Sequence, residues 1–407
     1  MKKSALHAYA RLIVRAGGNV RKGQEVMVFA QLDQPAFVYM MVEECYKAGA
    51  SKVMVEWDYQ PLTKLHVRHR SLNVLSKVEP WEEAKWAHRV KTLPVSIYLI
   101  SEDPDGLAGV NPSKHAKGHQ ARLQVIKPYR DEMENKYQWC IAAVPGKAWA
   151  KKIFPDLHVS KAVEKLWEAI LFTCRVGNDS MKAWEEHDRD LQSRCQYLNG
   201  LGLDSLHYTS SNGTDLTVGL IPQARFMAAG EYSLQGIYFN ANMPTEEVFI
   251  SPMRGKAEGI VYATKPLSYQ GQLIENFSIT FQDGKVTKVK AEKNENLLKE
   301  MIGMDEGAAM LGECAFVPYD SPIRETGLLF YNTLFDENAA SHLALGRGFS
   351  NCLKDYGNYT TAEAREMGIN DSLIHVDFMI GNEDLSIVGI THEGEKVQIF
   401  KYGNWAF

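Results

Sequence analysis

Cysteine is scarce in this 407-residue sequence, and the six that occur are scattered without a CxxC pair. This pattern is typical of free thiols in a reducing cytosol and argues against a disulfide scaffold. Long apolar runs are also missing. No stretch of about 20 apolar residues exists to span a bilayer, and the N-terminal MKKSALH lacks the apolar core of a signal peptide. We therefore expect a cytoplasmic protein without a membrane segment.

An excess of positive charge is missing as well, because 45 basic residues stand against 50 acidic ones for a net charge of −5. This balance argues against binding to nucleic acid or to a membrane surface.

A glycine-rich phosphate-binding loop is also missing. Ala30-Gln31-Leu32-Asp33 follows the first predicted strand, where such a loop would stand, so dinucleotide binding is disfavoured.

The first half of the chain alternates apolar strands with helices. Strands are predicted at 24–31, 52–57, 95–100 and 139–144, with helices at 35–47, 81–90 and 113–134 between them. Strands separated by helices form a mostly parallel sheet that is covered on both faces. A helical bridge at 160–198 follows, and its charge run 185–190 reads as a solvated face in which His187 is at best a weak metal lead. We predict an α/β domain over residues 1–198.

The second half changes to hairpins. The segments 206–210 and 216–220 flank the turn sequence Ser-Asn-Gly-Thr, and 277–281 and 285–289 flank Asp283-Gly284. The segments 385–390 and 397–400 repeat the pattern around Gly394. We predict an α+β, β-rich domain with inserted helices over residues 199–407, so the fold class is α/β plus α+β.

Residues 374–380, IHVDFMI, alternate like a half-buried strand. His375 and Asp377 are two apart and share one face of it, while Val376 takes the other. A solvated pair is the plain interpretation. The neighbouring residues are apolar, however, so burial of His375 and Asp377 needs a compensating partner.

A second histidine stands in the segment 335–342, FDENAASH. Asp336 is a good helix N-cap, so we expect His342 in the second turn of a short helix that Gly346 and Gly348 terminate. With Glu313 in Leu-Gly-Glu, these residues resemble a metal site. Mixed imidazole and carboxylate ligands suit zinc, cobalt or manganese better than calcium.

Four motifs in order resemble the thermophilic metallo-aminopeptidase family: 242–249 (NMPTEEVF), 311–313 (LGE), 333–340 (TLFDENAA) and 375–381 (HVDFMIG). The resemblance covers nearly the whole chain. It implies an exopeptidase that releases N-terminal residues from peptides with a free N-terminus, two divalent metal ions (zinc, cobalt or magnesium), and a homodimer that encloses the active sites. The family's metal ligands correspond by motif position to Glu247, Glu313, His342, His375 and Asp377.

Five ligands are few for two metals unless a carboxylate bridges them, and Glu313 or Asp377 is the expected bridge. Metals about 3.5–4 Å apart would activate the water between them. The free amino terminus would be bound by a metal or by an acidic side chain such as Glu246, so Glu313 and Glu246 are the candidate catalytic residues. The α/β half shows no chemistry of its own, and we expect it to build the dimer or limit substrate length.

One position departs from the family pattern. In that family a tyrosine usually stands seven residues after the histidine that corresponds to His342, and Phe349 occupies that place here. Either Tyr356 or Tyr331 supplies the hydroxyl instead, or the hydroxyl is dispensable, or the enzyme is weak. Two other functions stay open: hydrolysis of another small amide, and binding without catalysis.

Overall fold

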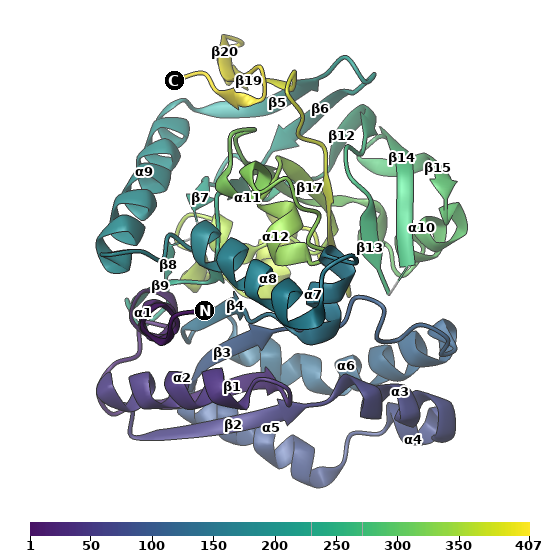
Figure 1. The fold of residues 1–407 in the computed structure, drawn as a ribbon. Coiled ribbons are helices and arrows are strands. Elements are labelled where there is room, and N and C mark those ends of the chain that lie inside the picture. Colours follow the sequence, from purple (N-terminus) through teal and green to yellow (C-terminus); the bar gives the residue numbers. More distant parts are fainter. Residues whose placement is uncertain (229, 271) are drawn as a thin grey trace. The chain divides into compact units, whose positions relative to one another are not determined.

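The computed structural model describes residues 1–228, 230–270 and 272–407, which fall into two compact units (Figure 1). The first unit comprises Met1–Glu186 and Gly230–Pro244, and the second comprises His187–Ala229 and Thr245–Phe407. We expected the domain boundary between residues 198 and 199, whereas the second compact unit begins at His187. The segment 230–244 returns to the first unit, which sequence patterns did not indicate.

A five-stranded parallel sheet organises the first unit. Its order is β10-β4-β3-β1-β2, and each neighbouring pair is parallel. The strands are β1 (Glu25–Gln31), β2 (Lys52–Asp58), β3 (Val95–Ile100), β4 (Trp139–Ala143) and β10 (Asn242–Met243). β1 and β3 are buried along most of their length, as expected for strands covered on both faces.

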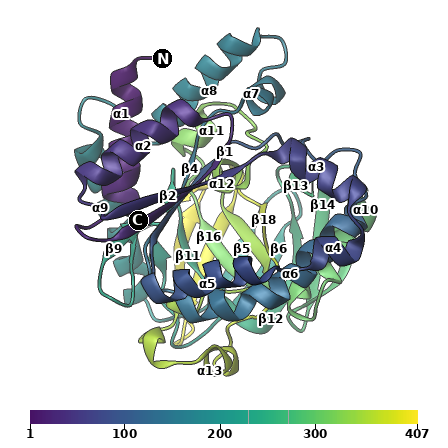
Figure 2. The same ribbon diagram turned by 90° about the horizontal axis from the view of Figure 1, so that it is seen from below.

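Helices cover both faces of this sheet. Around β1 and β2, Figure 2 shows α1 and α2 on one side and α5 and α6 on the other. The helices of the unit are α1 (Lys3–Leu12), η1 (Ile13–Gly17), α2 (Pro35–Lys47), α3 (Gln60–His69), α4 (Leu72–Ser76), α5 (Pro80–Thr92), α6 (Pro112–Met133), α7 (Lys147–Ile153) and α8 (Val159–Thr173), and a small hairpin pairs β8 (Gly230–Tyr232) with β9 (Tyr238–Asn240). Helix α9 (Ser180–Gly200) runs from this unit into the next.

The second unit contains a nine-stranded sheet that includes all three predicted hairpins. Its order is β13-β14-β12-β6-β5-β19-β20-β21, with β15 paired to β14. Asp283 and Gly284 both have positive φ, 51° and 74°, as a tight β14–β15 hairpin requires. The strands are β5 (Leu203–Thr209), β6 (Asp215–Leu220), β12 (Pro252–Tyr262), β13 (Leu267–Tyr269), β14 (Gln272–Gln282), β15 (Lys285–Lys293), β19 (Ser386–Thr391), β20 (Lys396–Lys401) and β21 (Asn404–Trp405).

A second, five-stranded sheet has the order β18-β17-β16-β11-β7 and is antiparallel throughout. Its strands are β7 (Met227–Ala228), β11 (Val248–Ile250), β16 (Leu311–Phe316), β17 (His342–Gly346) and β18 (His375–Met379). The helices of this unit are α10 (Glu295–Ile302), η2 (Gly307–Ala309), α11 (Pro322–Glu325), α12 (Thr333–Glu337), η3 (Ser350–Cys352), η4 (Tyr356–Asn358) and α13 (Thr361–Glu366). The predicted combination of an α/β part with a β-rich α+β part is confirmed.

The prediction that a helix extends to His342 is wrong. Helix α12 ends at Glu337, and His342 is the first residue of strand β17. Asp336 does not cap a helix that follows it, because its carboxylate accepts the backbone N–H groups of Phe330 (2.9 Å) and Asn332 (3.0 Å). Strand β17 lies between β16 and β18, and pairing on both edges outweighs the helix propensity of its alanine and leucine residues.

The structure also shows the state of the cysteines and the character of the helices. All six cysteines are buried, and none of them forms a disulfide in the described residues. Within the described ranges, none of the helices has the length and apolar character that crossing a bilayer requires.

Candidate metal centre

Four neighbouring strands of the five-stranded sheet carry the candidate ligands. Glu247 directly precedes β11, Glu313 lies in β16, His342 begins β17, and β18 carries His375 and Asp377. Residues far apart in sequence therefore come together because their strands are neighbours in the sheet order β18-β17-β16-β11.

The register decides which face these side chains occupy. Ala344 pairs with both Glu313 and Asp377, so the two carboxylates lie on the same face of the sheet. His342 pairs with Ala315, two residues beyond Glu313, and so shares that face. The alternate residues on the other face belong to the hydrophobic core: Val248, Cys314, Phe316, Leu343, Leu345 and Phe378. One face of the sheet is thus core, and the other is a polar site.

The first cluster joins Glu247, Glu313 and His342, whose ligand atoms all lie within 4.8 Å of one another. His342 Nε2 is 3.3 Å from Glu247 Oε2, and both side chains are buried. His342 Nδ1 lies 3.1 Å from the carbonyl oxygen of Ala340. A proton on Nδ1 donates to that carbonyl, which turns Nε2 toward the carboxylates, the direction in which a metal would be bound.

The second cluster joins Glu313, His375 and Asp377 within the same 4.8 Å limit. His375 Nε2 lies 3.1 Å from Glu313 Oε2 and 3.1 Å from Asp377 Oδ1. Its Nδ1 is 2.7 Å from the carbonyl oxygen of Arg347, which orients the ring in the same way as in the first cluster. Glu313 is therefore common to both clusters.

Burial and neighbouring charges shift the pKa values of Glu313, His342 and Asp377. Burial raises the pKa of Glu313 to about 7 against the opposing effect of His375. Burial lowers the pKa of His342, but the hydrogen bond and charge of Glu247 outweigh it and raise that pKa to about 10. Burial likewise opposes ionisation of Asp377, yet His375 lowers its pKa to about 2. Without metal, the site holds protons that a divalent cation would replace.

Glu337 is a site residue that sequence reasoning missed. It is the last residue of α12, and burial together with the charge of Asp377 holds its pKa well above the ordinary value. Its side chain is hydrogen-bonded to Asp377. A signal existed in the sequence, because Glu337 and His342 both stand in the segment 335–342. The helix expected there included His342 as its only candidate ligand.

The donor set fits divalent metal ions. Buried carboxylates and two imidazoles whose Nε2 atoms face them are the ligands that zinc and related ions take, and soft thiolates are absent from both clusters of described residues. Asp377 Oδ1 is buried, and its near partner is His375 Nε2 at 3.1 Å. A buried carboxylate of this kind is stabilised by a neighbouring positive charge, which a metal ion would also supply. His375 keeps 24% of its side-chain surface exposed, so the site has an open side.

Glu246 belongs to neither cluster, although it neighbours Glu247. Its Oε2 lies 3.8 Å from His187 Nε2, and its side chain is 5% exposed. Phe349 lies in the loop after β17, and its ring contacts the imidazole of His375 with centroids 4.8 Å apart. The catalytic role of Glu246 stays a prediction.

Comparisons with known proteins agree with a metal-dependent peptidase. The model of the thermophilic metalloprotease (M29) family matches residues 2–405. Aminopeptidase AmpS of Bacillus subtilis (strain 168) is 40% identical over 404 residues, which cover 99% of this chain and 98% of the relative. Aminopeptidase PepS of Streptococcus thermophilus is 38% identical over 406 residues, with the same coverage.

A solved structure agrees in three dimensions as well. Wild-type AmpT from Thermus thermophilus matches with a TM-score of 0.91 and 36% identity, and all of both chains is covered. The expected enzyme class, a hydrolase acting on peptide bonds, is thereby confirmed. With a family match over nearly every residue and a polar sheet face that gathers histidines and carboxylates, the chain belongs to the thermophilic metalloprotease (M29) family.

Proposed function

We propose that this protein is a dinuclear metal-dependent aminopeptidase that releases N-terminal residues from peptides. The observation that carries the proposal is the position of Glu313, which is shared by two adjacent clusters on one sheet face. A carboxylate between two ligand sets is the arrangement that holds two divalent ions close together. Relatives named aminopeptidases over the full length of the chain support the exopeptidase activity.

Each residue has a defined part in this proposal. Glu313 would be shared by the two ions, Glu247 and His342 would hold one of them, and His375 and Asp377 would hold the other. Glu337 adds a further carboxylate from α12 on the side of Asp377. When bound, the two ions would supply Lewis acidity toward the scissile carbonyl and lower the pKa of a water nucleophile. The buried carboxylates orient that centre, and the exposed edge of His375 leaves a path for the peptide.

We propose further that the ions are zinc, cobalt or magnesium, that the substrate carries a free amino terminus bound by an ion or by Glu246, and that the enzyme is a homodimer. Six buried cysteines without a disulfide among the described residues are consistent with a cytoplasmic setting. The first unit contributes none of the clustered ligands, which supports a role in dimer formation or in limiting peptide length.

Single alanine substitutions of His342, His375 and Asp377 test the proposed function. Each removes a ligand and leaves uncompensated charge in a buried site, so we expect loss of at least one metal equivalent and of most activity on aminoacyl anilides. His207→Ala is the matched control, because the exposed side chains of His207 and Asp215 contact each other (2.8 Å) on β5 and β6 of the same unit, outside both clusters. It should change neither metal content nor activity.

The outcome that contradicts the ligand assignment is a His375→Ala enzyme with full metal content and turnover. Substrates with a blocked amino terminus test the activity separately. An aminopeptidase should leave them intact, whereas equal cleavage would indicate a general amidase. Less than one metal equivalent in the unmodified protein, purified without chelator, would indicate a binding protein instead.

A further inference from the structure

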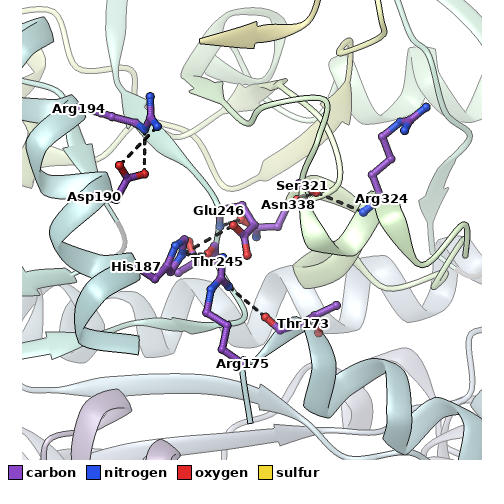
Figure 3. Close-up of polar contacts among 10 residues, drawn as sticks. All are labelled: Thr173, Arg175, His187, Asp190, Arg194, Thr245, Glu246, Ser321, Arg324 and Asn338. Carbon is purple, nitrogen blue, oxygen red and sulfur yellow. Dashed lines mark hydrogen bonds and ion pairs between the residues drawn. The ribbon is translucent and has the colours of Figure 1, made fainter. Parts of the chain in front are cut away.

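His187 is a largely buried polar residue in α9, in the middle of the charged run 185–190. It lies in the part of α9 that belongs to the second unit, and its side chain is 10% exposed. His187 Nε2 lies 2.8 Å from the carbonyl oxygen of Thr245, to which it donates a hydrogen bond. Figure 3 shows the ring directed at the segment formed by Thr245 and Glu246. His187 is therefore a contact for the chain that leads into the metal centre.

Asn338 approaches the same segment from the other side (Figure 3). It is fully buried, and its Oδ1 accepts the backbone N–H of Glu246 at 2.8 Å. Its Nδ2 donates to the carbonyl oxygen of Leu334 at 2.9 Å and lies 3.4 Å from Glu337 Oε1. The backbone carbonyl of Asn338 accepts the Ser321 hydroxyl at 3.0 Å. Every polar group of this side chain is thus used between α12 and the segment before β11.

These contacts join two carboxylate-bearing segments of the site. Glu247 directly follows the residue that Asn338 holds, and Glu337 directly precedes Asn338 in sequence and accepts from its amide. Glu247 belongs to the cluster with His342, whereas Glu337 contacts Asp377 of the other cluster. The Asn338 side chain therefore connects two segments. One is the segment before β11 that carries Glu247, and the other is the end of α12 that carries Glu337.

We infer that Asn338 and His187 are positioning residues that hold the Glu247 segment from two sides and set its place relative to Glu337. The inference rests on the proposed function, because it concerns ligand geometry in the same site. Neither residue is a candidate ligand itself, since both act on the backbone of residues 245–246. Groups that orient metal ligands in this way change metal affinity by about 10- to 100-fold when removed.

Metal titration of the metal-free protein with Co²⁺, followed by calorimetry, tests the inference without depending on activity. Asn338→Ala removes the Oδ1 atom that accepts the backbone N–H of Glu246 and the Nδ2 group that donates to Glu337 Oε1. We expect the ion held by Glu247 and His342 to bind about 10- to 100-fold more weakly, with a smaller change for the other ion. His187→Ala should weaken the same ion, and His187→Gln, which retains a side-chain donor, should restore part of the affinity.

Asn199→Ala is the matched control. Asn199 also clamps a backbone, because it accepts from Phe226 N (2.7 Å) and donates to Phe226 O (3.0 Å), but it holds no site carboxylate. It should leave both Co²⁺ affinities unchanged.

Unchanged Co²⁺ affinities in folded Asn338→Ala and His187→Ala proteins would overturn the inference. If Asn338→Ala does not fold, the His187 pair decides alone. If the unmodified protein binds only one equivalent of Co²⁺, the dinuclear centre is contradicted. The positioning role is then supported if Asn338→Ala lowers the affinity for that single ion, and it is overturned if the affinity is unchanged.

Discussion

Phe349 is the residue at which the chain departs from the pattern of the family it resembles. Its backbone N–H donates to Ser251 Oγ at 2.8 Å, and its ring packs between Phe249 and His375. The ring therefore lies against a proposed metal ligand, where a hydroxyl would be close to the site. Part of Tyr356 packs against the apolar cluster that includes Ile221 and Leu353.

Restoring the hydroxyl is a direct test at this position. We expect Phe349→Tyr to raise kcat by about a hundredfold, the size of one oxyanion donor. Steady-state kinetics on an aminoacyl anilide measures it, with Tyr331→Phe and Tyr356→Phe measured in parallel. An unchanged kcat in Phe349→Tyr, with a large loss in either other variant, would show that this second tyrosine already supplies the donor.

His342 gives the metal-free protein a pH-dependent stability. Its pKa is about 10 in the folded chain, against an ordinary value of 6.5, because the charge of Glu247 outweighs burial. Between these values the folded state binds more protons than the unfolded state, so stability falls as pH rises. The contribution is complete below pH 6.5 and is lost as pH rises through 10.

We therefore expect the Tm of the metal-free protein to fall between pH 7 and pH 10, measured by differential scanning calorimetry. The His342→Gln protein lacks this titration and should show a shallower dependence over the same range. Equal slopes in the two proteins would show that His342 does not carry the effect.

At the scale of elements, the paired strands β16, β17 and β18 contribute both to the hydrophobic core and to the candidate metal centre. Its residues alternate between the hydrophobic core and the ligand face, so the packing of one face orients the other. Gly346 pairs with His375 at the end of this ladder. It has a φ of 103°, and an added Cβ would lie 2.1 Å from the carbonyl oxygen of Ile374. The ladder can adopt this register only with glycine at 346.

Gly346→Ala should destabilise the protein by about 3 kcal/mol or more, because backbone strain and a backbone clash add together. Gly394→Ala is the control: its φ is 83°, but open space surrounds it, so only a conformational cost of about 1 kcal/mol is expected. Urea unfolding measures both. A loss no greater in Gly346→Ala than in Gly394→Ala would contradict this account of the ladder.

At the scale of the whole molecule, both ligand clusters of the described residues lie in the second unit. The first unit, built on a parallel sheet, is therefore available for assembly and for control of access. We expect sedimentation equilibrium to give twice the chain mass of 45.9 kDa. We also expect di- and tripeptides to be cleaved much faster than long, folded proteins. A monomer that digests folded proteins at comparable rates would contradict both expectations.

Local sequence determined several parts of this protein by itself. Alternating strands and helices in the first half indicated a parallel sheet, and turn sequences such as Asp283-Gly284 indicated the hairpins. The spacing of His375 and Asp377 placed both on one strand face, where the structure has them. These features were predictable because periodicity and turn chemistry act within a few residues.

Only the tertiary structure decided the rest of the site. His342 lies on a strand because β16 and β18 pair with its segment, and neither neighbour is close to it in sequence. Glu246 and Glu247 are adjacent, yet Glu246 is directed at His187 while Glu247 joins the ligand cluster. Glu337 comes to Asp377 through the placement of α12. Pairing and burial between distant segments set these directions, and no short-range pattern encodes them.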